Sequence, residues 1–151
     1  MRIETTRFGE TDVADESLVQ MPCGLPGFVH RRSFAVIPHP QGGPFQWLQS
    51  TEDPKLAFVI ADPLCFRPDY HVAVPRSEIE ELGLGDEADA QVWVICGIGP
   101  NPEDITANMA APIIVNRRTR AGKQVLVQSD PEDIRFPIIR YLRQMAEGAP
   151  S

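Results

Sequence analysis

The stretch that decides the fold reads FQWLQSTEDPKLAFVIADP and runs from Phe45 to Pro63. It predicts two strands, 45–50 and 56–62, joined by a tight turn at Asp53-Pro54, because proline presets the φ of the first central turn residue. Apolar side chains occupy both faces of the second strand: Leu56, Phe58 and Ile60 alternate with Ala57, Val59 and Ala61. Such a strand is typical of the middle of a fold, where both faces are buried.

A polar run, Gln49-Ser50-Thr51-Glu52-Asp53, separates the two strands. A rigid hairpin can present the side chains of its tip to a partner. We therefore expect partner contacts from four residues of this tip, which are Gln49, Ser50, Glu52 and Asp53.

The composition favours one mainly β domain. The chain has 151 residues, of which 42% are hydrophobic and 23% charged, as in ordinary globular proteins. Its 15 prolines are dispersed along the chain and favour short strands over long helices. We expect a single domain over residues 1–151, with a β core over about 1–129 and a helical segment over about 130–148, in which Pro137 takes the first helical position.

The charge balance points to a basic protein partner. The chain has 14 basic and 21 acidic residues, which gives a net charge of −7. Nucleic acids and anionic membranes require clustered cations, so an acidic chain is a poor match for them, whereas an acidic surface steers basic proteins. Six acids lie between residues 76 and 91, namely Glu78, Glu80, Glu81, Asp86, Glu87 and Asp89. This segment is either a solvated acidic face or a docking surface for a basic partner.

A short helix is predicted inside this acidic segment. Ser77 is expected to cap its start, with Glu80 three residues later as in a capping box, and Gly83 is expected to end it. The basic cluster of the chain is interpreted as the solvated tip of a hairpin rather than as a nucleic-acid site; its residues are Arg117, Arg118, Arg120 and Lys123.

The loop Gly24-Leu25-Pro26-Gly27-Phe28 holds two glycines and one proline, so it is expected to be an irregular loop whose aromatic side chain packs into the core. It is either a structural corner or a partner-contacting loop. At the C-terminal end, Ile138, Leu142 and Met145 share one helical face, which either covers the open end of the sheet or binds a groove of a partner.

No catalytic or cofactor-binding motif is present. There is no G-x-S-x-G, H-E-x-x-H or P-loop sequence, and the three histidines have no zinc-site spacing. No signal peptide or membrane span is evident, and the three cysteines suit small, buried, reduced thiols in a cytoplasm. We therefore expect a cytoplasmic binding protein with no catalytic residue, no metal and no cofactor.

Several short motifs together resemble the flagellar assembly factor FliW family. They are Gly24 to Phe28, Trp47 to Ser50 with Glu52 to Pro54 and Ala57-Phe58, Thr106 to Asn108 with Ala111 to Ile113, and Gly122 to Gln124. The resemblance covers roughly residues 1–128. It implies a compact pseudo-barrel of two packed antiparallel sheets, with one or two short helices and a C-terminal helix.

The resemblance also implies a function. Members of this family bind flagellin and the basic RNA-binding regulator CsrA in a partner switch that relieves CsrA repression of flagellin translation, and we expect a monomer. The predicted partner-binding residues are Leu25, Phe28, Gln49, Ser50, Glu52, Asp53, Glu80, Glu81, Asp86, Glu87 and Asn108. The acidic residues are expected to face CsrA, and a groove beside the 24–28 loop is expected to hold flagellin. The alternatives are a small β-barrel that binds a ligand or a flavin, and a structural subunit that oligomerises.

Overall fold

The computed structural model describes residues 1–39, 43–71, 74–85, 87–97, 99–101, 104–127 and 130–138. Its strands are β1 (Arg2–Thr5), β2 (Gly9–Asp12), β3 (Leu18–Gln20), β4 (Ser33–Pro38), β5 (Phe45–Ser50), β6 (Ala57–Ala61), β7 (Ala90–Gly97), β8 (Thr106–Ala107), β9 (Ile113–Asn116), β10 (Gly122–Gln124) and β11 (Phe136–Pro137). One α-helix, α1 (Arg76–Leu82), and four short 3₁₀ turns, η1 (Asp15–Ser17), η2 (Pro63–Cys65), η3 (Glu87–Asp89) and η5 (Pro131–Arg135), accompany them in the described ranges. None of the described helices is long and apolar enough to span a membrane.

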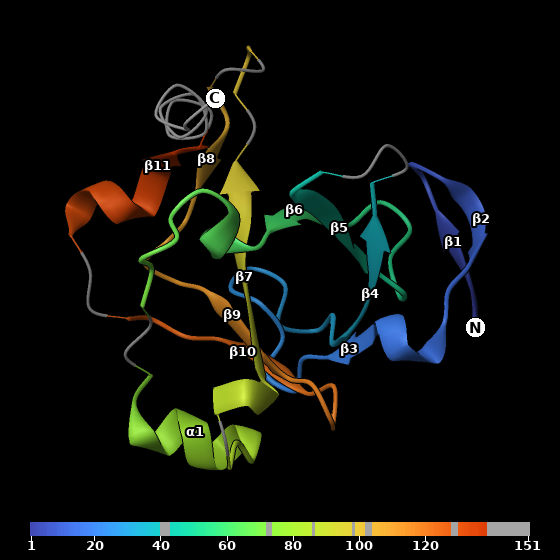
Figure 1. Ribbon diagram of the computed structural model, residues 1–151. Helices are drawn as coiled ribbons and strands as arrows, with labels where there is room; N and C mark the ends of the chain where they lie inside the picture. The colour runs from blue at the N-terminus through green and yellow to red at the C-terminus, as the bar shows by residue number, and fades with distance from the viewer. Residues whose placement is uncertain are drawn as a thin grey trace, which may run out of the picture.

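Strands β1 and β2 form a two-stranded antiparallel sheet, and the other nine strands form one large antiparallel sheet that curls back on itself. Its order is β10-β9-β7-β6-β5-β4-β3, with β8 beside the second half of β7 and β11 beside β8. The two ends of this order meet, because Gln20 forms a parallel bridge with Ala121 and its N–H donates to the Arg120 carbonyl at 2.9 Å. The predicted pseudo-barrel of antiparallel strands is therefore confirmed (Figure 1).

The β5–β6 hairpin confirms the central prediction. It runs in register from Phe45 opposite Ala61 to Gln49 opposite Ala57. The turn has Pro54 at its first central position, and the Leu56 N–H donates to the Asp53 carbonyl at 3.1 Å. The side chain of Asp53 also accepts the N–H of Lys55 at 3.0 Å, which is the local hydrogen bond that favours aspartate in turns.

Both faces of the sheet are packed. The interior cluster takes residues from most strands of the barrel, namely Val19, Met21, Leu25, Phe34, Val36, Leu48, Ile60, Trp93, Ile113 and Val115. On the outer face, the β1–β2 hairpin covers Ala35 with Ile3 and Val13. Elsewhere on the outer face, Leu82 at the end of α1 packs against Ile114 and Val125. Figure 1 shows α1 and the β1–β2 hairpin on different sides of the barrel.

Two predicted boundaries are wrong. Helix α1 begins after Pro75, which has no side-chain cap, so Ser77 lies inside the helix rather than at its N-cap. Gly83 ends the helix with a φ of 67°, as predicted for glycine. Pro137 was predicted to open the last helix. It lies in β11 instead and pairs with Thr106 of β8, because the chain stays extended from Phe136. Ile138, the first residue of the predicted amphipathic face, is fully buried in one cluster with Phe66 and Ala107, whereas Leu142, Met145 and the rest of that predicted helix lie outside the described residues.

Candidate functional site

The first two residues of the polar tip of the β5–β6 hairpin are buried. Gln49 is fully buried, and its Nε2 lies 3.0–3.3 Å from the carbonyl oxygens of Ser50, Asp53, Pro54 and Leu56. Ser50 is also fully buried, and its Oγ accepts the N–H groups of Glu52 and Asp53. The expectation that Gln49 and Ser50 are presented to a partner is therefore corrected: both side chains are used to hold the turn, since its backbone groups need hydrogen-bond partners.

The two acids of the tip stay nearer the surface but are also engaged. Glu52 Oε1 accepts the N–H groups of Ser33 at 2.9 Å and Arg32 at 2.7 Å, and these bonds lower the pKa of Glu52. Asp53 Oδ2 lies 3.8 Å from Nε of Arg31. Partner contact by Glu52 and Asp53 stays a prediction, but any partner would meet carboxylates that already have donors.

The 24–28 loop places its residues in the opposite way to the prediction. Leu25 is 2% exposed and fills the barrel interior, whereas Phe28 is 41% exposed and lies edge-on against Phe58 at 5.5 Å between ring centroids. The reason is a turn in which Phe28 N–H donates to the Leu25 carbonyl at 2.7 Å, with Gly27 at a φ of 84°. This turn points the leucine inward and leaves the aromatic ring on the rim.

The acidic segment is partly neutralised by the basic hairpin 117–123. Nζ of Lys123 lies 2.7 Å from Oε2 of Glu78 and 2.9 Å from Oε2 of Glu81. These contacts raise the pKa of Lys123 and lower the pKa of Glu81. Nε of Arg118 lies 3.4 Å from Oδ2 of Asp89. The interpretation of this basic cluster as a solvated tip is therefore wrong for Lys123, which links α1 to β10.

The remaining predicted residues are dispersed. The side chain of Glu80 is 75% exposed and lies 4.0 Å from Arg76. Glu87 lies in η3, and Asp86 falls outside the described residues. Asn108 is half-buried, and its Oδ1 accepts the N–H of Ala110 at 3.1 Å, so it caps a backbone group as its residue type suggests. The structure thus does not gather the predicted residues into one site.

A groove that the sequence did not predict lies beside α1. It encloses about 540 Å³ and is lined by residues of η2, α1, β7 and β9 and of the segments between them: Asp62, Pro63, Leu64, Tyr70, His71, Val74, Ile79, Leu84, Gly85, Ala90, Gln91, Val92, Ile114 and Arg117. None of these residues belongs to the 24–28 loop, so the groove lies elsewhere than expected. The available signal was the outward position of Val92 and Ile114, which alternate with the inward Trp93 and Ile113.

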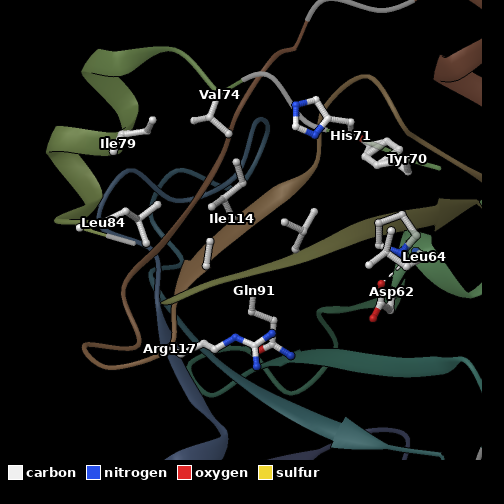
Figure 2. Close-up of a pocket in the computed structure, with 14 residues that line it drawn as sticks. Asp62, Leu64, Tyr70, His71, Val74, Ile79, Leu84, Gln91, Ile114 and Arg117 are labelled. Atoms are coloured by element: carbon white, nitrogen blue, oxygen red, sulfur yellow. Dashed lines mark hydrogen bonds between the residues drawn. The ribbon is translucent and has the colours of Figure 1, made fainter. Parts of the chain in front are cut away.

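The groove has an apolar side and a polar edge. Figure 2 shows Val74, Ile79 and Leu84 on one side of the opening and Arg117, Gln91 and Asp62 along another. The phenol of Tyr70 donates to the Met109 carbonyl at 2.6 Å, and burial raises the pKa of Tyr70 to about 12, so it stays protonated at neutral pH. This arrangement suits the recognition of an amphipathic partner.

The cysteines and metal-binding side chains add no reactive centre in the described ranges. All three cysteines are free, and Cys23 and Cys65 are exposed, contrary to the prediction of small buried thiols. Cys96 is buried as predicted, which raises its pKa to about 12. No group of three or more histidine, cysteine or acidic side chains that could hold a metal occurs among the described residues.

The fold and this surface define a small antiparallel β pseudo-barrel with an apolar groove beside a single helix. Residues 2–138 match the family model described as FliW protein, and the chain belongs to the FliW family. It is 34% identical to the flagellar assembly factor FliW of Alkaliphilus metalliredigens over 97% of this chain and 91% of that protein. The FliW of Desulfitobacterium hafniense strain Y51 is 38% identical over 91% of both chains.

A solved structure supports the same assignment. A crystal structure of the flagellar assembly factor FliW superposes with a TM-score of 0.81 at 29% identity, over 91% of this chain and 96% of that chain. The resemblance inferred from the short motifs is therefore confirmed, and so is the mainly β fold that it implied.

Proposed function

We propose that this chain is a cytoplasmic flagellar assembly factor without enzymatic activity, which acts by holding one protein partner at a time. The partners are flagellin before its export and the translational regulator CsrA. While flagellin occupies the chain, free CsrA represses flagellin translation. Once flagellin is exported, the chain binds CsrA and the repression is relieved.

The observation that carries this proposal is the apolar groove beside α1. Terminal segments of flagellin are amphipathic helices before assembly, and amphipathic helices bind by laying their apolar face into such a groove. The half-buried side chains of Val74, Ile79 and Val92 supply apolar surface from the segment before α1, from α1 and from β7. We assign the groove to flagellin.

Helix α1 gives the two partners a physical reason to exclude one another. One side of α1 lines the groove through Ile79, and the helix also carries the exposed carboxylate of Glu80. A basic protein such as CsrA is attracted to the carboxylates of this helix. Because both contacts share one short helix, occupancy of the groove changes the surface that CsrA meets.

Titration of the purified chain with flagellin and with CsrA, alone and in competition, tests the proposal. Ile79→Asp should weaken flagellin binding at least tenfold, since it places a charge on the apolar side of the groove. Ile134→Asp is the matched control, because Ile134 is 55% exposed and does not line the groove. If the wild-type chain binds neither partner, the function is wrong; if Ile79→Asp binds flagellin normally while folded, the groove assignment is wrong.

The CsrA contact has its own test. Reversing the charges of Glu80, Glu81, Asp86 and Glu87 should slow CsrA association and change its salt dependence. Glu80→Lys alone is the sharper variant, because Glu81 also pairs with Lys123 and its reversal would disturb α1. Glu132→Lys, at an exposed position in η5, is the control. Unchanged association of the Glu80 variant with CsrA at low salt would contradict an acidic docking face.

A second candidate function is the binding of a small ligand or a flavin. A groove of about 540 Å³ falls within the size range of ligand sites, and its edge carries Arg117, Gln91 and Asp62 as polar groups. Purified protein should then carry an ultraviolet or visible absorbance that is lost on denaturation and filtration. A spectrum of aromatic residues alone would count against it.

A further inference from the structure

The loop from Gly24 to Arg32 is a rigid platform with two apolar side chains on its outside. Phe28 is 41% exposed and Val29 is 51% exposed. The loop is tightly closed on itself, because the backbone at Gly24 lies so close to Val29 that a Cβ would come within 2.6 Å of the Val29 Cα. Its ends are fixed by Leu25 in the core and by the hydrogen bond from the Met21 N–H to the Arg32 carbonyl at 2.7 Å.

The acidic and basic side chains around this platform differ in whether they have partners. The nearby carboxylates have donors, since Glu52 accepts two backbone N–H groups and Asp53 lies 3.8 Å from Arg31. In contrast, the side chains of His30 and Arg32 are exposed and donate no hydrogen bond within the described part of the chain, although the charge of Arg32 helps to lower the pKa of Glu52. The polar groups of the platform that remain available to a partner are therefore the hydrogen-bond donors of His30 and Arg32. An arginine guanidinium recognises carboxylates in particular.

We propose that the platform formed by residues 28–32 docks a segment of a partner protein in which carboxylates flank an aromatic or aliphatic side chain. The apolar side chain packs on Phe28 and Val29, and the carboxylates accept from Arg32 and His30. Glu52 and Asp53 border the platform and disfavour a polyanion such as a nucleic acid or a lipid surface, whose negative charges are not confined to two positions. This inference does not depend on the flagellar partners proposed above, and it concerns a surface separate from the groove beside α1.

Selection from a phage-displayed library of random 12-residue peptides tests the chemistry without a presumed partner. We expect the wild-type chain to enrich peptides in which aspartate or glutamate stands within two positions of a phenylalanine, tryptophan, leucine or isoleucine. The same selection on the double variant Phe28→Ser/Arg32→Glu should not enrich them. Failure to enrich this pattern, or its equal enrichment on the double variant, would overturn the proposal.

Titration of the leading peptide then identifies the contacts. Arg32→Glu and Phe28→Ser should each weaken binding at least tenfold, and binding should fall as salt rises because charge pairs at the rim are screened. Arg135→Glu and Leu126→Ser are the matched controls, because both residues are exposed and lie outside the platform; each should stay within twofold of wild type. Should Phe28→Ser fail to fold by circular dichroism, Val29→Ser replaces it with the same expected loss.

A membrane surface is the main alternative occupant, and the same variants distinguish it. Vesicles of phosphatidylglycerol should not sediment with the wild-type chain at 0.15 M salt. Sedimentation with vesicles that is lost in Arg32→Glu, together with no peptide binding, would assign the platform to lipid and overturn the proposal. Because flagellin and CsrA binding is assigned to the surface around α1, failure of the peptide test leaves those titrations unaffected.

Discussion

Two neighbouring loops of the barrel place their side chains in opposite ways. The tip of the β5–β6 hairpin is polar in sequence, yet Gln49 and Ser50 are fully buried. The 24–28 loop contains the most exposed phenylalanine in the described part of the chain, although it is the more apolar of the two. The loops touch, because Glu52 of the first accepts the N–H groups of Arg32 and Ser33, which follow the second.

The difference shows that backbone hydrogen bonding, rather than side-chain polarity, decides which residues of a loop are buried. The hairpin tip turns sharply and brings four carbonyl groups together, and the amide of Gln49 donates among them while three of them also accept a backbone N–H, so Gln49 is buried. The 24–28 loop satisfies its own turn through the backbone, so its side chains are free to divide between the core and the surface.

One substitution in the 24–28 loop should cause the largest loss of stability, and a second substitution in the same loop provides the comparison. Leu25→Ala should lower the free energy of unfolding by about 2–5 kcal/mol, because it leaves a cavity in the barrel interior. Phe28→Ala should cost less than about 1.5 kcal/mol, since the ring is partly exposed and loses mainly one edge-on aromatic contact. Urea unfolding measures both, and equal losses for the two variants would contradict the assignment of Leu25 as the anchor.

Replacing the buried amide of Gln49 at the hairpin tip should cause the second largest loss of stability. Gln49→Leu keeps the volume but removes the side-chain donor that four carbonyl groups share, three of which retain a backbone N–H donor, at a cost of about 1–3 kcal/mol. Gln20→Leu, on the exposed side of β3, is the matched control and should change stability by less than about 0.5 kcal/mol. A Gln49→Leu variant as stable as the control would mean that the tip is held by its backbone alone.

The sequence predicted the parts of the fold that depend on local patterns. Strand β5 matches its predicted range, and the turn at Asp53-Pro54 forms with the expected hydrogen bond. These elements follow from alternation and turn chemistry, which act between residues close in sequence. The cap of α1 was misplaced because Ser77 and Pro75 offer competing starts two residues apart.

The candidate site could not be predicted in the same way, because it depends on contacts between distant residues. The groove joins side chains from positions 62 to 117, and Lys123 reaches residues 42 and 45 positions earlier to pair with Glu81 and Glu78. Nothing in the local pattern distinguishes Lys123 from the exposed Arg117 and Arg118. Sequence reasoning found the charged segments but not that two of them meet.

The hairpin 117–123 is neither fully buried like Gln49 nor on the rim like Phe28, and a substitution in it should lower the free energy of unfolding by a smaller, salt-dependent amount. Lys123 is partly exposed, and it carries the ion pairs that hold α1 against β10. Lys123→Met should lower stability less than Gln49→Leu does, and the loss should shrink in 1 M salt because charge pairs are screened. Lys55→Met, at an exposed position without an ion pair in the described ranges, is the control. A loss of stability that salt leaves unchanged would assign the role of Lys123 to packing instead.

Removing the contact that Glu52 makes between the two loops should have the smallest effect on stability, and this effect should depend on pH. The backbone N–H groups of Ser33 and Arg32 hold the pKa of Glu52 below its ordinary value of 4.5, so the ionised carboxylate favours the folded state. This stabilisation is present above the ordinary pKa and is lost as pH falls through the lowered pKa of the folded state. The stability gap between wild type and Glu52→Gln should therefore be constant from pH 7 to 6 and narrow below pH 4.5. The difference in stability between wild type and Gln20→Leu is the reference, because this substitution removes no titratable group. If the difference between wild type and Glu52→Gln also stays constant down to pH 3, the two loops are not joined through this carboxylate.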